Sequence, residues 1–260
     1  MIQSLGPKTS SLWRSALAVL AISALVLFAA GLRSAPRSTR GAPPLDDAGL
    51  LDGFRHVEVA SISDAMEKVT GQRTYTSHRM RPIFPSRFVG FALTVMLKKD
   101  ENHDPNALQG MLEAIDSGSA DSVYVMVLED GNDIAGMGGL MGTAMAARNF
   151  SGAVIDGGVR DVAYLQKIGF PVFALGVVPS TSINHYRFAG SRIPVVCDGV
   201  PVSPGDIVAA DSDGVVFIPR SKATEILPVA QEMDFKEHSM YGYIEKLKSI
   251  VEAVKKFGRL

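Results

Sequence analysis

The segment from Gly138 to Asp161 contains two groups of residues that could together bind an organic acid and a metal ion. Gly138 and Gly139 open a predicted helix, whose first N–H groups are free to hold a carboxylate. Arg160 and Asp161 follow a short apolar run and a second pair of glycines. A guanidinium binds a carboxylate through two parallel hydrogen bonds, and aspartate oxygens are ligands suited to Mg²⁺ or Mn²⁺. The pattern predicts a site for a 2-oxo acid on a divalent metal, with Asp161 as the metal ligand.

The alternatives for these two groups are a surface ion pair and a flexible glycine loop. An Arg-Asp pair at a helix start is favoured by the helix dipole without any ligand. Here the pair follows a predicted buried strand, where open α/β sheets place their sites, so we favour the functional interpretation. A dinucleotide-binding interpretation of Gly136, Gly138 and Asp156 is weaker, because Met141 stands where that motif needs its third glycine.

Hydrophobic runs and turn residues predict the elements that would position this site. Apolar runs alternate with helical segments, which implies parallel βαβ units, with strands at 88–97, 123–128, 153–155 and 171–178 and helices at 106–115, 140–148 and 162–168. We expect Gly157 and Gly158 to form a tight exit from their strand, and Ser63 to cap an earlier helix. Asp-Gly and Pro-Gly turns predict antiparallel, barrel-like strands at 193–197, 200–202, 207–210 and 215–218, before a helical end at 221–257.

Composition narrows the class of protein. The chain has 260 residues, of which 47% are hydrophobic, so it can form a full core. Its formal net charge of -1 gives no reason to expect a nucleic-acid partner. The single cysteine, Cys197, excludes an internal disulfide and a cysteine-based metal cluster, and its apolar neighbours indicate core packing.

An apolar segment near the N-terminus predicts an association with a membrane. Residues 15–32 carry no charge and follow Lys8 and Arg14, which favours a signal peptide or a transmembrane helix within residues 1–32. Residues 33–45 form a linker rich in Pro and Arg, and residues 46–260 form the predicted folded domain. A signal peptide would export the domain, whereas the linker arginines tend to keep the following segment in the cytoplasm. An exported domain and a domain anchored on the inner side of the membrane therefore both stay open.

A longer stretch resembles a known family. The sequence GGLMGTAMAARNFSGAVIDGGVRDVAYLQKIGFPVFALGVVP is similar to the shared core of the RraA-like family, which includes 4-hydroxy-4-methyl-2-oxoglutarate aldolases and regulators of ribonuclease activity. The segments SISDAMEKVTGQ and VPVSPGDIVAADSDGVVFIPR resemble the opening and closing parts of the same family. The ribonuclease regulators often lack the Asp that follows Arg in the VRD motif, whereas this chain keeps it as Asp161, which favours catalysis.

The resemblance implies a fold, an assembly and a site. The fold would be a three-layer β/β/α swivelling-domain fold with a central βαβ unit, assembled into homotrimers or hexamers with the site between subunits. Arg160 would contact pyruvate, Asp161 would hold the metal, and the backbone of Gly138, Gly139, Leu140 and Met141 would bind the acid group. A Glu from the C-terminal region of a neighbouring subunit would complete the site, with Glu237 as the first candidate and Glu232 as the reserve.

The predicted function is a lyase that depends on Mg²⁺ or Mn²⁺. It would cleave a 4-hydroxy-2-oxo acid, such as 4-hydroxy-4-methyl-2-oxoglutarate, to pyruvate, and could also decarboxylate oxaloacetate. Since the sequence places no Lys as a Schiff base, the metal would stabilise the negative charge. One alternative is a non-catalytic regulator that binds another protein. Methyltransferase activity ranks last, because no strand is followed directly by a Gly-rich cofactor loop.

Overall fold

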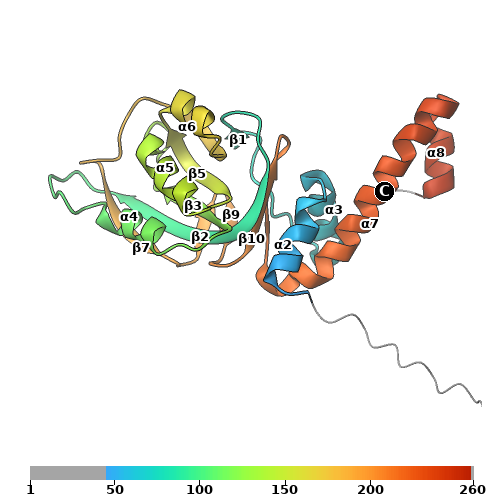
Figure 1. Ribbon diagram of the computed structural model, residues 1–260, viewed down its shortest axis with the longest axis horizontal. Helices are drawn as coiled ribbons and strands as arrows, with labels where there is room; N and C mark the ends of the chain where they lie inside the picture. The colour runs from blue at the N-terminus through green and yellow to red at the C-terminus, as the bar shows by residue number, and fades with distance from the viewer. Residues whose placement is uncertain (1–44, 259–260) are drawn as a thin grey trace, which may run out of the picture. The chain divides into compact units, whose positions relative to one another are not determined.

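A nine-stranded mixed sheet lies at the centre of residues 45–258, the part of the chain described by a computed structural model (Figure 1). The strands are β1 (Arg81–Pro82), β2 (Phe88–Lys99), β3 (Ser122–Leu128), β4 (Ala135–Met137), β5 (Gly152–Val159), β6 (Val172–Val177), β7 (Tyr186–Ser191), β10 (Ile207–Asp211) and β11 (Gly214–Ile218). Their order is β1-β6-β5-β3-β2-β10-β11, with β4 beside β5 and β7 beside β2. The strands β2, β3, β5 and β6 are parallel, whereas β10 runs antiparallel to β2 and β11.

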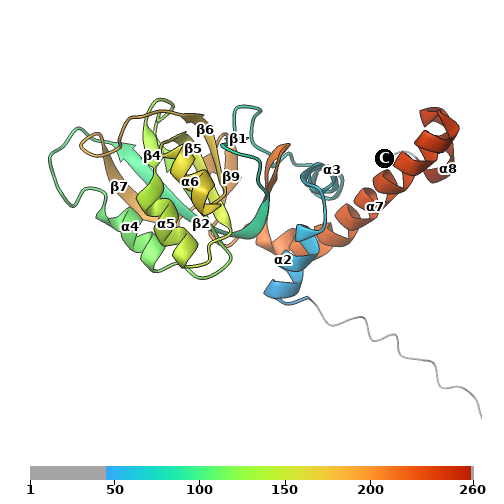
Figure 2. The same cartoon turned by 45° about the horizontal axis from the view of Figure 1, so that its top comes forward.

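The predicted βαβ units are confirmed. Helix α5 (Gly139–Ala147) lies between β3 and β5 in the chain, and α6 (Val162–Ile168) connects β5 to β6. Together with α4 (Gln109–Asp116) they cover one face of the sheet (Figures 1 and 2). The hairpin of β8 (Val195–Cys197) and β9 (Val200–Val202) packs on the other face, with Cys197 fully buried there. The protein therefore has a mixed α/β fold, in which helices cover one face of the sheet and the hairpin packs on the other.

Strand β3 shows why both faces of the sheet are covered. Every residue of β3 is buried, because its alternate side chains enter two different cores. Tyr124, Met126 and Leu128 pack under the helices, whereas Val123 and Val125 pack under the hairpin. The sheet is thereby fixed on both sides, which gives the ends of its strands a rigid position.

A second group of helices packs against β10, β11 and the start of β2. It consists of α2 (Asp47–Arg55), α3 (Val59–Thr70) and α7 (Ala223–Leu247), and α7 is followed by α8 (Ile250–Phe257). The prediction that Ser63 caps a helix is wrong, because α3 begins at Val59 and contains Ser63. The first N–H groups of α3 donate instead to distant carboxylates, from Glu58 to Asp234 (2.9 Å) and from Val59 to Asp211 (3.0 Å).

The glycine pair before Arg160 also differs from the prediction. Gly157 and Gly158 do not form an exit turn, because β5 continues through them to Val159. A Cβ on Gly158 would lie 2.9 Å from the carbonyl oxygen of Ile134, and the Gly158 N–H donates to that oxygen (2.8 Å). The glycine therefore allows the chain before β4 to approach β5 closely.

The predicted membrane association is corrected here. Between residues 45 and 258, no helix combines the length and the apolar character that are needed to cross a bilayer. The apolar segment 15–32, and the N-terminal hydrophobic helix expected in it, lie outside the described residues. The membrane-anchored or exported localisation predicted from the sequence is therefore not retained.

Candidate functional site

Asp161 lies where the starts of two helices meet. It is the N-cap residue of α6 and adopts a left-handed backbone conformation, with φ 59° and ψ 33°. Its carboxylate does not cap α6, but its Oδ2 accepts a hydrogen bond from the Gly139 N–H at the start of α5 (2.8 Å). A negative charge at a helix N-terminus is stabilised by the helix dipole. The glycine pair and the acid that the sequence singled out are therefore in direct contact.

Arg160 lies beside Asp161 and is held by the loop that follows β6. One terminal nitrogen of its guanidinium donates to the Ser180 carbonyl (3.1 Å), and its Nε lies 3.9 Å from Asp161 Oδ2. Ser180 is fixed in turn, because its hydroxyl donates to the Asp133 carbonyl and accepts from the Ala135 N–H. The Arg160 side chain is 43% exposed, so its remaining N–H groups are accessible to a ligand.

The first turn of α5 supplies backbone donors next to this pair. Gly138 is the N-cap residue, so the N–H groups of Leu140 and Met141 belong to the first turn, where the helix itself provides no acceptor. Gly138 also lacks room for a side chain, since a Cβ there would lie 2.5 Å from Asp161 Oδ2. The glycine thus allows the carboxylate to reach the helix start.

These groups line one cavity with a volume of about 530 Å³. Gly138, Leu140, Met141, Arg160 and Asp161 all contribute to its lining, whereas Gly139 takes part through its hydrogen bond to Asp161. Strand β4 (residues 135–137) also lines the cavity, and the remaining wall comes from residues 104–109, 111 and 112, before and within α4, and from residues 181–184, before β7. The cavity has the size of a site for a small ligand.

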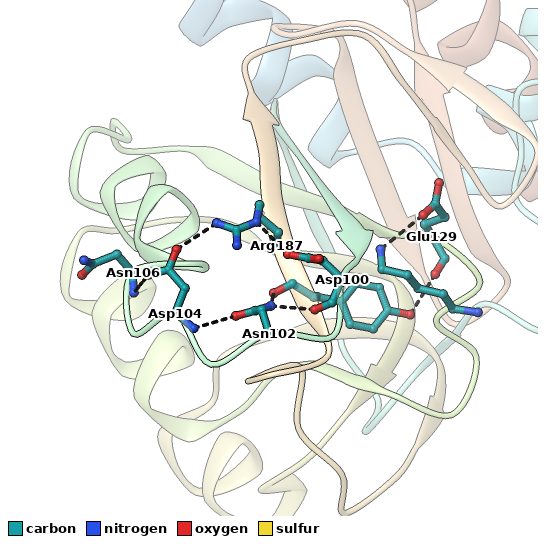
Figure 3. A network of polar contacts seen from close by, with 8 residues as sticks. Asp100, Asn102, Asp104, Asn106, Glu129 and Arg187 are labelled. Atoms are coloured by element: carbon teal, nitrogen blue, oxygen red, sulfur yellow. Dashed lines mark hydrogen bonds and ion pairs between the residues drawn. The ribbon is translucent and has the colours of Figure 1, made fainter.

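Arg187 holds this remaining wall through two ion pairs (Figure 3). Its guanidinium donates to the carboxylates of Asp100 (2.7 Å) and Asp104 (2.9 Å). The Asn102 side chain donates to the Asp100 carbonyl and accepts from the Asp104 N–H. The Asp104 carboxylate also accepts a hydrogen bond from the Asn106 N–H. This hydrogen bond and the one from Arg187 lower the pKa of Asp104. Asp104 therefore carries a full negative charge at neutral pH.

The sequence predicted a helix at 106–115 in the first part of this wall, but no residue of either part was assigned to the site. In the structure Asn184 lines the cavity and Arg187 belongs to β7. A signal was present in the segment DENHDPN, where an Asp or an Asn occupies every second position from 100 to 106. Asp and Asn side chains accept a hydrogen bond from the backbone N–H two residues further on and thereby stabilise a turn. Asn102 and Asp104 make this contact here.

The oxygen atoms at this site fit a divalent cation that is bound by Asp161 on one side and by a ligand on the other. Gly139 and Arg160 both approach Asp161 Oδ2, and the Asp161 side chain is 48% exposed, which leaves Oδ1 for a metal. Within residues 45–258, no group of three or more His, Cys, Asp or Glu side chains is placed to hold a metal ion. Mg²⁺ commonly binds through one or two carboxylates and keeps its other positions for water and substrate. Asp161 would hold such an ion alone among the side chains of this cavity.

Glu237 lies on α7 and does not line the cavity of its own chain. Its carboxylate accepts a hydrogen bond from the Tyr241 hydroxyl (2.7 Å), which raises the pKa of Tyr241 to about 12. The reserve candidate, Glu232, pairs with Lys236 on the same helix (2.6 Å). Helix α7 packs with α2 and α3, away from α5 and α6 in both views (Figures 1 and 2). The participation of Glu237 through a neighbouring subunit stays a prediction.

Gly138→Ala is expected to disrupt the site without unfolding the protein. The new Cβ would meet Asp161 Oδ2 at 2.5 Å and Arg160 Cγ at 3.1 Å, so the carboxylate must leave the start of α5. We expect the variant to lose about tenfold or more of its Mg²⁺ affinity, measured by calorimetry with oxalate present. Gly176→Ala in β6 is the matched control, because a Cβ at Gly176 meets nothing within 4 Å. Equal Mg²⁺ affinity in the two variants would contradict the arrangement described here.

Comparisons with known proteins agree with this architecture. A family model described as "RraA-like: Aldolase/RraA" matches residues 59–217. A relative from Halalkalibacterium halodurans, named "Putative 4-hydroxy-4-methyl-2-oxoglutarate aldolase", is 28% identical over 186 residues, which are 69% of this chain and 80% of the relative.

Two solved structures share the fold. The match to a crystal structure of an uncharacterized protein from Pseudomonas syringae covers 83% of this chain and 97% of that chain, with 26% identity and a TM-score of 0.73. The second structure is Streptomyces coelicolor RraAS2, described as an unusual member of the RNase ES inhibitor RraA protein family. The match covers 79% of this chain and 99% of that chain. It shows 22% identity and a TM-score of 0.65, and at that identity the likeness concerns the fold alone. Since the family model spans more than half of the sequence, the chain belongs to the RraA-like family.

Proposed function

We propose that the protein is a divalent-metal-dependent aldolase that cleaves a 4-hydroxy-2-oxo acid and releases pyruvate. One observation carries the proposal: Asp161, Arg160 and the first turn of α5 border the same cavity. An anion bound there would meet a guanidinium and helix N–H groups, and a cation beside it would meet a carboxylate. The name of the Halalkalibacterium halodurans relative supports the same reaction class.

Each group has a defined task in such a reaction. The N–H groups of Leu140 and Met141 would bind the substrate carboxylate, and Asp161 would hold Mg²⁺ or Mn²⁺. When bound, the cation would supply Lewis-acid stabilisation of the 2-oxo oxygen. Arg160 would add a fixed positive charge where negative charge develops as the C3–C4 bond breaks. Its anchoring on Ser180 matters, because a charge that is already in place needs no reorganisation during the reaction.

Proton transfer needs a further group. Cleavage removes the proton of the 4-hydroxyl group, and C3 of the product gains a proton. The two acids that line the cavity are already engaged, Asp161 at the start of α5 and Asp104 with Arg187. For this transfer we propose Glu237 of a neighbouring subunit, as the resemblance to the aldolases implies, in a homotrimer or hexamer whose site lies between subunits.

Pyruvate release tests the proposed function directly. The full chain, supplied with a 4-hydroxy-2-oxo acid, should release pyruvate with Mg²⁺ or Mn²⁺ and stop when EDTA removes the metal, as followed by coupled reduction of pyruvate to lactate. Oxaloacetate should also yield pyruvate under the same conditions. A chain that binds another protein but releases no pyruvate from any of these compounds would instead be a non-catalytic regulator.

A further inference from the structure

We propose that the cation at Asp161 keeps its water ligands in a second cavity, where the hydroxyl groups of Tyr164 and Thr143 hold those waters. The proposal rests on the metal dependence of the function proposed above and adds two side chains to the site. Tyr164 and Thr143 would be positioning residues, because they act on the cation through its waters and touch neither the cation nor the substrate. Both belong to the chain that carries Asp161, so the argument requires no residue of a neighbouring subunit.

The second cavity adjoins the first at Asp161. It has a volume of about 560 Å³ and is bordered by the starts of α5 and α6, with Thr143 and Tyr164 in its wall. These two helices pack together and lie side by side in both views (Figures 1 and 2). Asp161 and Leu140 line both cavities, whereas Arg160 lines the first and not the second. The carboxylate of Asp161 is therefore accessible from two sides of different character.

The position of Arg160 separates the tasks of the two cavities. Its Nε lies 3.9 Å from Asp161 Oδ2, the oxygen that also accepts the Gly139 N–H. A divalent cation close to this guanidinium would be repelled, because like charges at short range interact strongly. The cation is therefore favoured on the side of Asp161 away from Arg160, toward the second cavity. The first cavity is left for the anionic ligand, which Arg160 attracts.

The two hydroxyl groups of the second cavity suit the waters of a cation. A water bound to a divalent cation is a strong hydrogen-bond donor, because the cation makes its protons more acidic. The Thr143 hydroxyl donates its own proton to the Gly139 carbonyl (2.7 Å), so its oxygen remains an acceptor. The Tyr164 oxygen lies 3.4 Å from the Thr143 oxygen, and it too has a lone pair to offer. Adjacent helices thus present a pair of acceptors.

The Tyr164 ring fixes the place of its hydroxyl. A Cβ on Gly139 would lie 3.0 Å from Tyr164 Cδ1, so the ring lies against the glycine whose N–H contacts Asp161. Thr143 is four residues after Gly139, and one helical turn spans about 5.4 Å. Two metal–oxygen distances of about 2.1 Å and a hydrogen bond of about 2.8 Å reach up to about 7 Å from the carboxylate. The hydroxyls lie within that range of helix α5.

Mn²⁺ binding to the full chain, measured by calorimetry without substrate, tests the proposal independently of any activity. Tyr164→Phe removes the hydroxyl and keeps the ring against Gly139. We expect it to weaken Mn²⁺ binding about tenfold, the loss typical of removing a partner of a metal's ligand. Tyr75→Phe is the matched control, because Tyr75 is 45% exposed, against 44% for Tyr164, and lines neither cavity. Its Mn²⁺ affinity should stay within about twofold of the wild type.

Oxalate binding at saturating Mn²⁺ distinguishes a role in holding water from a role in supporting α5. Oxalate would lie in the first cavity, on the N–H groups of Leu140 and Met141, so a shift of the helix start would weaken it. We expect Tyr164→Phe to bind oxalate within about twofold of the wild type. Thr143→Val should also weaken Mn²⁺ binding, and Thr143→Ser, which keeps the hydroxyl, should restore it.

Each outcome decides the inference. Weaker Mn²⁺ binding in Tyr164→Phe with unchanged oxalate binding supports it. Unchanged Mn²⁺ binding overturns it, and so does a parallel loss of oxalate binding, which would show that Tyr164 supports α5. An altered sedimentation coefficient of Tyr164→Phe would also overturn it, because the hydroxyl would then serve a contact between subunits.

The same measurements separate this inference from the proposed function. If the wild type binds Mn²⁺ no better than Asp161→Asn does, the metal-dependent function and the inference are both wrong. If Mn²⁺ binding depends on Asp161 and Tyr164 as expected but no 4-hydroxy-2-oxo acid releases pyruvate, the aldolase function is wrong and the inference about the waters stands.

Discussion

The Asp161→Asn variant is expected to lose metal-dependent pyruvate release by about 10²–10³-fold or more, the loss typical of removing one preorganised charged group. Asp161 is the one carboxylate beside Arg160 and the start of α5 among the described residues that line the cavity. An asparagine there retains an oxygen for the Gly139 N–H but has no negative charge for a cation. The variant should therefore lose Mg²⁺ binding while keeping the local backbone arrangement.

The thermal stability of the Asp161→Asn variant must be measured together with its activity. Since the hydrogen bond to Gly139 is preserved, its thermal unfolding midpoint should lie within about 3 °C of the wild type. Asp64→Asn, on the exposed face of α3, is the matched control and should retain full activity. Wild-type turnover in Asp161→Asn would remove this residue from the mechanism. A large fall in its unfolding temperature would instead assign Asp161 a structural role.

Arg160→Met is expected to lower kcat/KM for pyruvate release by a similar factor of about 10²–10³, mainly through kcat. The methionine keeps much of the apolar stem, but it removes the positive charge and the hydrogen bond to the Ser180 carbonyl. Arg160→Lys should recover part of the activity, because it restores the charge without the forked geometry of a guanidinium. Initial rates at several substrate concentrations separate the effect on kcat from that on KM.

The loop that holds Arg160 provides the control for this comparison. The Ser180 hydroxyl is held by the Asp133 carbonyl and the Ala135 N–H independently of Arg160. The loop that contains Ser180 should therefore keep its conformation when Arg160 is replaced. Equal activities of Arg160→Met and the wild type would show that Arg160 makes no contribution to the transition state. Equal activities of Arg160→Met and Arg160→Lys, both far below the wild type, would show that geometry matters and charge alone does not.

The helix boundaries near the site could be predicted because their signals are local. Helix α6 has the predicted bounds Val162–Ile168, since Gly169 ends it in a left-handed conformation with φ 68°. Helix α5 begins at the predicted glycine pair and is followed by Asn149, also left-handed with φ 59°. A left-handed residue after a helix is favoured for Gly and Asn by their own conformational preferences, so the sequence suffices to locate it.

Features that depend on distant contacts were not predictable in this way. The start of α3 is set by carboxylates at 211 and 234, which are separated from it by 152 and 176 residues in the chain. Strand β7 acquires its place only by pairing with the end of β2, and Arg187 in it fixes Asp100 and Asp104. The contribution of this remaining wall to the cavity could therefore not be predicted from the sequence. The Arg160-Asp161 pair could be proposed from the sequence because its two residues are adjacent in the chain.

A crystal structure of the full chain with Mn²⁺ and oxalate, which mimics the chelating end of a 2-oxo acid, tests the central claim most directly. The account predicts an anomalous Mn²⁺ peak within about 2.2 Å of an Asp161 carboxylate oxygen. It also predicts that oxalate contacts Arg160 and the N–H groups of Leu140 or Met141. A Mn²⁺ ion and oxalate bound at another place, with Asp161 in contact with neither, would contradict it.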